Sequence, residues 1–244
     1  MKGVIYRISP DVQIADISHT IRPQNVLEGS LVWTRSYSYF PEGTIHVAVI
    51  DPGVGTHRRA IAARLGPYFF VCPDNGLITP ILEGAERNGD PVEIVVLDQP
   101  RFWLPQVSTV FHGRDIFAPV SAHLANGVPL KELGTPINDP VRQYLPEARA
   151  FQGGWRGEVI NIDHFGNLGT NVTGDQLKGI HNIRVRAGDH EIDGLVKTFG
   201  EKAAGELVSL IDSDNCLSIS IVNGNAAKEL GLDIGDPVEV ILKA

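Results

Sequence analysis

Strand-like and helix-like runs of residues alternate along the first half of the chain. Short runs rich in β-branched and aromatic residues are separated by segments whose apolar residues recur at roughly helical spacing. Because strands that alternate with helices commonly pair in parallel, we expect an α/β sandwich domain with a central, mostly parallel sheet. The predicted strands are 4–8, 44–50, 68–72 and 92–97, and the predicted helices are 25–39, 77–84 and 115–125.

The pattern changes beyond residue 134. Three prolines and the pair Gly153-Gly154 predict a connection between domains across 134–154. Short strands separated by turns follow, which is the pattern of a small β-barrel-like domain. We therefore expect an α/β domain at 1–145 and a C-terminal β-barrel domain at 146–244. The second domain has predicted strands at 158–162, 183–185, 207–211, 217–222 and 238–242, and a predicted helix at 226–230.

Acidic residues outnumber basic ones. The 29 acidic and 21 basic side chains give a net charge of −8, which argues against nucleic acid or an anionic membrane as a partner. No apolar run is long enough to span a bilayer and the first residues lack the apolar region of a signal peptide, so we expect a cytoplasmic protein. Cys72 and Cys216 are far apart and belong to no Cys/His cluster, so we expect no metal site and interpret both as small buried apolar residues.

The first candidate for chemistry is the segment Asp51-Pro52-Gly53-Val54-Gly55-Thr56-His57-Arg58-Arg59, which follows a predicted buried strand. In open α/β sheets ligands bind at the carboxyl ends of strands, which is where Asp51 lies. The segment is neither a Walker loop nor a dinucleotide-binding fingerprint. An ordinary Asp-Pro turn is the alternative interpretation.

A second candidate is Phe111-His112-Gly113-Arg114-Asp115, which leads into a predicted helix. A histidine, an arginine and an aspartate this close together at a helix start could form a polar site. The alternative is that Asp115 caps the helix and His112 is an ordinary loop residue.

Two further candidates lie in the second domain. In Asp163-His164-Phe165-Gly166-Asn167 the terminal carboxylate and amide could grip an ammonium group and a polar base edge, although both residue types also favour turns. The segment Asn223-Gly224-Asn225-Ala226-Ala227 offers free backbone groups to a heterocycle, or merely a helix cap.

These four segments, in this order, resemble one family, the S-adenosyl-L-methionine (SAM) hydroxide adenosyltransferases, which are relatives of the adenosyl fluorinase and chlorinase. The similarity runs over essentially the whole chain. It implies an α/β sandwich domain with a small β-barrel domain, assembled as a homotrimer with each site between subunits. The matching segments are 1–5, 16–19, 40–44, 51–56, 73–76, 111–119, 163–167, 225–227 and 235–236.

The resemblance also implies a reaction. In the hydroxide branch a water-derived nucleophile attacks the 5′ carbon of the adenosyl group and releases adenosine and neutral methionine, with no cofactor and no metal. The family's catalytic Asp–Arg–His set falls on Asp51, Arg58 and His112. Arg58, a permanent cation, is expected to hold and polarise the water, and Asp51 and His112 to orient it and accept its proton.

The substrate contacts are carried over in the same way. Asp163 is expected to bind the methionine ammonium group, Asn167 and residues 225–227 to read the adenine edge, and Phe111 to line the reaction-centre pocket. Ser213 is a candidate for the methionine carboxylate, in a loop that departs from the family pattern. The implied substrate-binding residues are Phe111, Gly113, Asp163, Asn167, Ser213, Asn225, Ala226 and Ala227.

The beginning of the chain also departs from the family pattern. Family members usually start with a strand and a Thr-Asp-Phe-Gly-type loop whose acidic residue holds the ribose diol, and this sequence starts after that loop. We expect that the start was assigned at an internal methionine; the alternative is a chain that lacks one strand and one substrate contact.

Two other functions stay open at this stage. A halide nucleophile would require an apolar, hydroxyl-lined nest, whereas the Asp51, Arg58 and His112 set is intact here. A protein that holds adenosine or SAM without turnover is the alternative from a different class. Analysis of the products formed from SAM separates all three.

Overall fold

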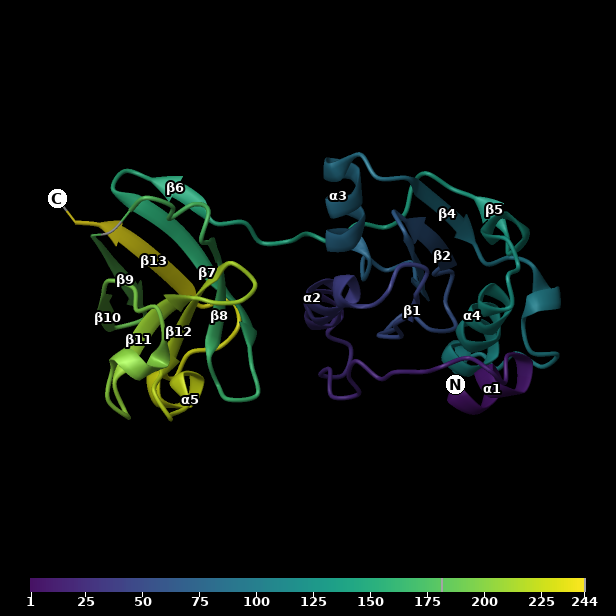
Figure 1. The fold of residues 1–244 in the computed structure, drawn as a ribbon, viewed down its shortest axis with the longest axis horizontal. Coiled ribbons are helices and arrows are strands. Elements are labelled where there is room, and N and C mark those ends of the chain that lie inside the picture. The colour runs from purple at the N-terminus through teal and green to yellow at the C-terminus, as the bar shows by residue number, and fades with distance from the viewer. Residues whose placement is uncertain (181, 244) are drawn as a thin grey trace. The chain divides into compact units, whose positions relative to one another are not determined.

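The computed structural model describes residues 1–180 and 182–243. The chain folds as two compact units, Met1–Leu145 and Pro146–Ala244 (Figure 1). Within the described residues, no helix is both long enough and apolar enough to cross a membrane.

The N-terminal unit is a mixed β-sheet with helices on both faces, so the expected α/β class is confirmed (Figure 1). The strand order is β1-β3-β2-β4-β5. Strands β1 and β3 are parallel, but β3–β2, β2–β4 and β4–β5 are antiparallel, so the expectation of a mostly parallel sheet is wrong. The strands are β1 (Ile45–Val47), β2 (Ala60–Leu65), β3 (Tyr68–Pro73), β4 (Val92–Val96) and β5 (Thr135–Pro136); the α-helices are α1 (Lys2–Ile8), α2 (Val26–Ser36), α3 (Thr79–Asn88) and α4 (Ala118–Ala125).

Strand β2 shows why the apolar pattern did not reveal strand direction. Ile61, Ala63 and Leu65 pack toward α2 and α3, whereas Ala60 and Ala62 pack toward α4. A strand buried on both faces reads as a continuous apolar run whether its neighbours are parallel or antiparallel.

Two expected segments are placed differently by the structure. The predicted strand at 4–8 lies in helix α1, which packs beside α4 and pairs with no strand of the sheet. The predicted connection at 134–154 is divided between the two units. Its first part belongs to the N-terminal unit, where β5 pairs with β4 and the backbone N–H of Val141 donates to Asp74 Oδ1 at 2.8 Å. Its later part includes a strand of the C-terminal unit, Arg149–Phe151.

The C-terminal unit is an antiparallel, nearly closed barrel, as expected from the sequence. The strand order is β10-β9-β13-β7-β8-β12-β11, and β6 pairs with β7. The two edge strands of this sheet, β10 and β11, are linked through the residues that follow β10. Val196 N–H donates to the Ser209 carbonyl at 2.9 Å, and Ser209 Oγ donates to the Gly194 carbonyl at 2.7 Å. The strands are β6 (Arg149–Phe151), β7 (Gly154–Ile162), β8 (Leu168–Thr173), β9 (Ile183–Ala187), β10 (His190–Asp193), β11 (Leu207–Ile211), β12 (Cys216–Ile221) and β13 (Pro237–Leu242), with one α-helix, α5 (Ala226–Leu230).

Candidate active site

Asp51 and Arg58 lie at the two ends of a tight loop between β1 and β2. Beyond β1 the chain is held at the Ile50 carbonyl, which accepts the Asn75 side-chain amide at 2.8 Å. The loop then reverses direction through Gly55, whose φ is 77°. A Cβ atom at this position would lie 2.2 Å from the Thr109 carbonyl oxygen, so only glycine fits. The reversal brings Arg58 back to face Asp51.

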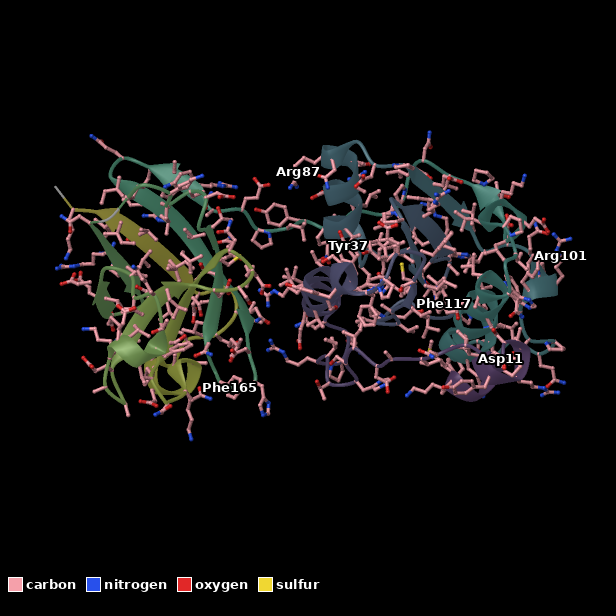
Figure 2. All side chains as sticks on the ribbon, in the orientation of Figure 1. Asp11, Tyr37, Arg87, Arg101, Phe117 and Phe165 are labelled. Carbon is pink, nitrogen blue, oxygen red and sulfur yellow. The ribbon has the colours of Figure 1, made fainter. Side chains whose placement is uncertain are left out.

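The two side chains form a bidentate ion pair inside the unit. Arg58 Nε donates to Asp51 Oδ1 at 3.0 Å and Nη2 donates to Oδ2 at 2.5 Å. The side chains of Arg58 and Asp51 are only 7% and 5% exposed. The Arg58 guanidinium also lies 5.5 Å from the ring centroid of Phe117, which Figure 2 labels. Such a fork of charged hydrogen bonds fixes both groups in direction as well as in distance.

His112 joins this pair from a second loop, which leads into the π-helical turn Gly113–Phe117. Its Nδ1 atom lies 3.1 Å from Arg58 Nη2. A guanidinium nitrogen only donates, so Nδ1 must be the acceptor and a neutral ring carries its proton on Nε2. The structure therefore brings Asp51, Arg58 and His112 into one connected group.

The environment of His112 favours the neutral ring. Burial and the positive charge of Arg58 lower the pKa of His112 below its usual 6.5, against the opposing effects of Asp51 and Asp115. Protonation would have to occur at Nδ1, which faces the Arg58 cation. In this arrangement His112 presents a donor at Nε2, and Asp51 is the member of the set with lone pairs free to accept a proton.

The neighbours of His112 in the sequence differ in their surroundings. Phe111 is 56% exposed, and the Arg114 guanidinium lies 4.8 Å from its ring centroid. Gly113 lies close to the extension of β1, since a Cβ atom there would be 3.5 Å from Val49 Cγ1. Their predicted roles in substrate binding stay predictions.

The C-terminal unit brings together its own predicted residues around the β7–β8 turn. Asp163 Oδ1 accepts the backbone N–H groups of Phe165 and Asn167, each at 2.9 Å, and Oδ2 accepts the Asn167 side-chain amide at 2.8 Å. The side chains of Asp163 and Asn167 thus face one another. Asp163 also stabilises the turn, which is the alternative role that the sequence left open. Phe165, labelled in Figure 2, is 72% exposed.

Residues 225–227 pack directly on this turn. Ala227 N–H donates to the Gly166 carbonyl at 2.9 Å, and a Cβ atom on Gly166 would lie 2.2 Å from Asn225 Cγ. Asn225 also caps α5 by accepting the Lys228 N–H at 2.8 Å, and Ala226 is fully buried. The third and fourth sequence candidates therefore form a single surface cluster.

Ser213 lies apart from this cluster. It is exposed in the turn between β11 and β12, before β12 begins, whereas Asn225 follows the end of β12. The Asp212 carboxylate holds that turn by accepting the N–H groups of Asp214 and Cys216, each at 2.9 Å. The structure places no other predicted substrate residue beside Ser213.

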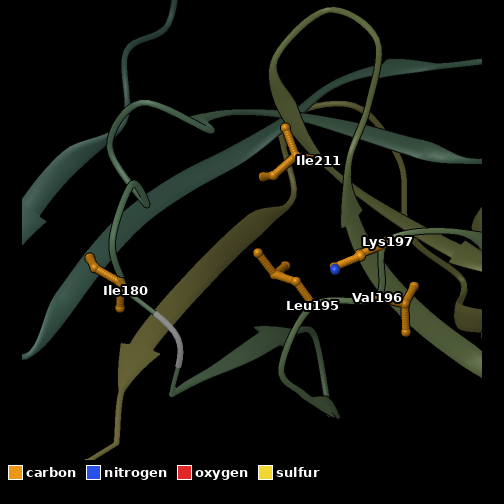
Figure 3. A pocket seen from close by; sticks show the side chains of 5 residues that line it. All are labelled: Ile180, Leu195, Val196, Lys197 and Ile211. Atoms are coloured by element: carbon orange, nitrogen blue, oxygen red, sulfur yellow. The ribbon is translucent and has the colours of Figure 1, made fainter.

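Two further features bear on ligand binding. Among the described residues, no group of three or more His, Cys, Asp or Glu side chains is arranged to hold a metal ion. A hollow of about 410 Å³ in the C-terminal unit is lined by Ile180, Leu195, Val196, Lys197 and Ile211 (Figure 3). None of the predicted site residues lines it.

Of the two interpretations that the sequence left open for Asp115, the structure does not support the helix cap. The Asp115 carboxylate does not cap a helix but lies fully buried in the π-helical turn, where it accepts the Ser108 N–H at 2.8 Å and two bonds from Arg114. The cluster of polar residues after His112 was a usable signal, but the burial of Asp115 depends on how the 104–111 segment folds back.

Comparison with known proteins identifies the family. The sequence matches the SAM hydroxide adenosyltransferase N-terminal domain over residues 1–134 and the C-terminal domain of that family over residues 157–239. The chain belongs to the SAM hydroxide adenosyltransferase family. The resemblance seen in the sequence is thereby confirmed.

Several relatives of this family member carry names. The (R)-S-adenosyl-L-methionine hydrolase of Salinispora tropica is 39% identical over 242 residues, covering 98% of this chain and 90% of its own. The protein of the same name from Thermus thermophilus is 35% identical over 249 residues, covering 99% and 92%. A fluorinase from an Actinoplanes species is 32% identical over 198 residues, covering 70% and 65%.

A solved structure supports the fold over the same length. The crystal structure of an uncharacterised conserved protein from Thermotoga maritima matches with a TM-score of 0.89 at 36% identity, covering 98% of this chain and 93% of that one. The two-unit architecture of the SAM hydroxide adenosyltransferase family member described here is therefore shared with a relative of similar length.

Proposed function

We propose that this protein hydrolyses SAM to adenosine and L-methionine by attack of water at the 5′ carbon of the adenosyl group. The observation that carries the proposal is the connected set of Asp51, Arg58 and His112, joined by hydrogen bonds of 2.5–3.1 Å. The side chains of Asp51 and Arg58 are buried, and His112 is half-buried. The set belongs to a chain whose relatives over nearly its full length are named (R)-SAM hydrolase.

Arg58 is suited to hold the attacking water. Its guanidinium group has five N–H groups. Among the described residues, four of these have an acceptor: two donate to Asp51, one to His112 Nδ1 and one to the Arg59 carbonyl. The remaining N–H donates to one lone pair of the water, and His112 Nδ1 keeps the guanidinium group in this direction by accepting from Nη2. A lone pair of the water is then directed at the carbon.

The leaving group and the proton follow from the chemistry of a sulfonium ion. As the water oxygen bonds to the 5′ carbon, the carbon–sulfur bond breaks and its electron pair stays on sulfur, so methionine leaves as a neutral thioether. The oxygen in the new bond is then a protonated alcohol, which is a strong acid. Asp51 is basic enough to take that proton although Arg58 pairs with it.

The finer parts of the proposal rest on the family resemblance. Asp163 binds the methionine ammonium group, Asn167 with residues 225–227 contacts the adenine, and Ser213, Phe111 and Gly113 complete the substrate contacts. The reaction uses no metal or cofactor, and the chain assembles as a homotrimer with each site between subunits. The turn of 163–167 against 225–227 supports the adenine contact, because it leaves polar edges at one surface.

The decisive experiment is incubation with SAM in ¹⁸O-labelled water. We expect the label in the 5′-hydroxyl group of adenosine and none in methionine, with little turnover by Asp51→Asn, which keeps the shape of the side chain but not its basicity. Formation of 5′-halo-adenosine in halide buffer would identify a halogenase, and binding of SAM without any product would identify a binding protein. Loss of activity on treatment with a chelator would contradict the metal-independent reaction.

A further inference from the structure

We propose that Asp115 is a positioning residue for this reaction: its carboxylate fastens the turn that carries His112 to the preceding 104–111 segment and so holds the imidazole ring against Arg58. The inference rests on the proposed function, since it assigns a part in the same reaction.

The carboxylate of Asp115 is fully buried and its oxygens are bonded on both sides. Oδ1 accepts Arg114 Nε at 2.6 Å, and Oδ2 accepts Arg114 Nη2 at 3.1 Å and the backbone N–H of Ser108 at 2.8 Å. A carboxylate without exposure is costly unless it is paired in this way. The bonds to Arg114 and Ser108 lower the pKa of Asp115, so it stays charged.

These bonds link the two loops that meet at the proposed site. Ser108 is followed by Thr109, whose carbonyl oxygen lies against Gly55 in the loop between Asp51 and Arg58. The Asp115 carbonyl also accepts the Leu104 N–H at 2.9 Å, so both the side chain and the backbone of Asp115 hold the 104–111 segment. His112 lies in the chain between this segment and Asp115.

The backbone around His112 is irregular, which makes such a fastening necessary. Residues Gly113–Phe117 form a π-helical turn before α4 begins at Ala118. Single π-helical turns within helices are energetically unfavourable and are often found at functional sites. An interaction from inside the turn keeps it from relaxing into a regular helix, which would rotate the His112 side chain.

Asp115 also acts on His112 through its charge. Three charged groups shift the pKa of His112: Arg58 lowers it, and Asp51 and Asp115 raise it. Removal of the Asp115 charge lowers that pKa, whereas release of the ring from Arg58 raises it. The position of the ring is therefore measured by the His112 Nδ1 signal, which reports the bond from Arg58 directly.

The chain offers a matched control in Asp74. Its side chain is 1% exposed and likewise pairs with one arginine, Arg59 at 2.7 Å, and one backbone N–H, that of Val141 at 2.8 Å. Asp74 is not among the groups that shift the pKa of His112. The variants Asp115→Asn and Asp74→Asn remove the same kind of buried charge from the same unit.

The test compares the two variants by the ¹⁵N NMR signals of the His112 ring nitrogens and by the kinetics of SAM hydrolysis. For Asp115→Asn we expect the ¹⁵N signal of His112 Nδ1 to move, because the ring loses its hydrogen bond from Arg58. We expect kcat to fall about ten- to a hundredfold with KM changed less than about threefold, because the ring is misplaced rather than the substrate contacts. For Asp74→Asn we expect lower stability with the wild-type His112 Nδ1 signal. If Asp115→Asn does not fold, Arg114→Ala is used, which retains the Ser108 bond and is expected to lower kcat in the same sense.

Three results would overturn the proposal. The first two are a wild-type His112 Nδ1 signal and an unchanged kcat in folded Asp115→Asn. The third, which applies if only Arg114→Ala folds, is an unchanged kcat in Arg114→Ala. The NMR measurement needs no turnover. If the wild-type protein does not hydrolyse SAM, the proposed function fails, whereas the His112 Nδ1 signal still decides whether Asp115 positions that ring.

Discussion

The Nδ1 atom of His112 accepts a hydrogen bond from Arg58, and this contact separates the roles of the two groups that the sequence proposed as proton acceptors. With Nδ1 occupied and the proton on Nε2, His112 is a donor. Asp51 is then the proton acceptor of the proposed reaction. The sequence alone left this division open, because the tautomer depends on a contact between residues 54 positions apart.

The role of His112 as a neutral donor predicts an acid limb in the pH profile of the chemical step. The pKa of His112 lies below 6.5, so the rate should be level at neutral pH and fall only below that value, as the ring becomes protonated and loses its bond from Arg58. Single-turnover rates of wild-type protein and His112→Ala test this. The variant should be slower by about ten- to a hundredfold, lack that limb, and bind adenosine within a few-fold of wild type. An acid limb centred above 6.5 would contradict the assignment.

His46 is a second histidine with a strongly altered environment, and it bears on stability rather than on the reaction. It is 4% exposed, stacks on Phe70 with ring centroids 5.3 Å apart, and meets Tyr37, Phe40 and Tyr68 edge-on. Its Nε2 atom has no hydrogen-bond partner among the described residues. Burial lowers the pKa of His46 to about 4.

This burial predicts acid destabilisation that a phenylalanine would remove. The unfolded chain binds a proton at His46 near pH 6.5 and the folded chain only near pH 4, so the unfolding free energy falls as the pH drops between these values. The loss approaches about 3 kcal/mol at the lower end. Denaturant unfolding of wild-type protein and His46→Phe across this range should give curves that converge toward neutral pH and separate in acid. A constant difference at all pH values would show that the His46 pKa is not lowered.

At the scale of elements, the sequence predicted the positions of most strands and helices but not their pairing. The predicted ranges lie close to four observed elements, β3, β4, α2 and α3. No strand was predicted at 60–65, where β2 lies. A usable signal was present, because Gly66-Pro67 separates two apolar runs and Gly66 adopts a φ of 58°, which favours a tight hairpin. Recognising that hairpin would have predicted the antiparallel pairing of β2 and β3.

The error at residues 4–8 has a different origin. Strand propensity describes how well a side chain fits a half-buried pleated surface, and here no strand of the described sheet lies beside this segment. A helix satisfies its own backbone groups, and 2–8 forms α1 against α4 instead. Propensity alone could not reveal that no strand of the described sheet lies beside residues 4–8.

The turn at 163–167 allows the charge of Asp163 to be tested apart from its structural role. In Asp163→Asn the remaining carbonyl oxygen can still accept the N–H groups of Phe165 and Asn167, so the turn should persist while the charge is lost. We expect SAM to bind about ten- to a hundredfold more weakly and adenosine, which has no ammonium group, nearly as before.

Calorimetric titration with both ligands measures these effects, and two variants serve as controls. Asp163→Ala removes the turn bonds as well as the charge, so both ligands should bind more weakly. Asn167→Ala should weaken adenosine and SAM alike, since it is proposed to contact the adenine. Equal losses of both ligands in Asp163→Asn would show that Asp163 only shapes the turn.

At the scale of the whole molecule, the order of motifs along the chain was more informative than any single motif. Asp-Pro, His-Gly and Asn-Gly segments are common in turns, and three of the four candidates also have an ordinary structural role here: the Gly55 reversal, the Asp163 turn and the Asn225 cap. Their succession over both units identifies the family, which the domain matches show. The assembly of the chain, in contrast, has to be measured.

The proposed homotrimer with sites between subunits predicts complementation between inactive variants. Sedimentation should give a particle of three times the 26.5 kDa chain mass. Suppose that each site takes position 51 from one chain and position 167 from another. When Asp51→Asn and Asn167→Ala chains are co-expressed and mix at random, both positions are then intact in about a quarter of the sites. Mixed trimers should therefore hydrolyse SAM at low concentration about a quarter as fast as wild type, whereas each variant alone stays nearly inactive. If both positions of a site belong to one chain, every site in the mixture carries a defect, and the mixture would be no more active than the variants that compose it.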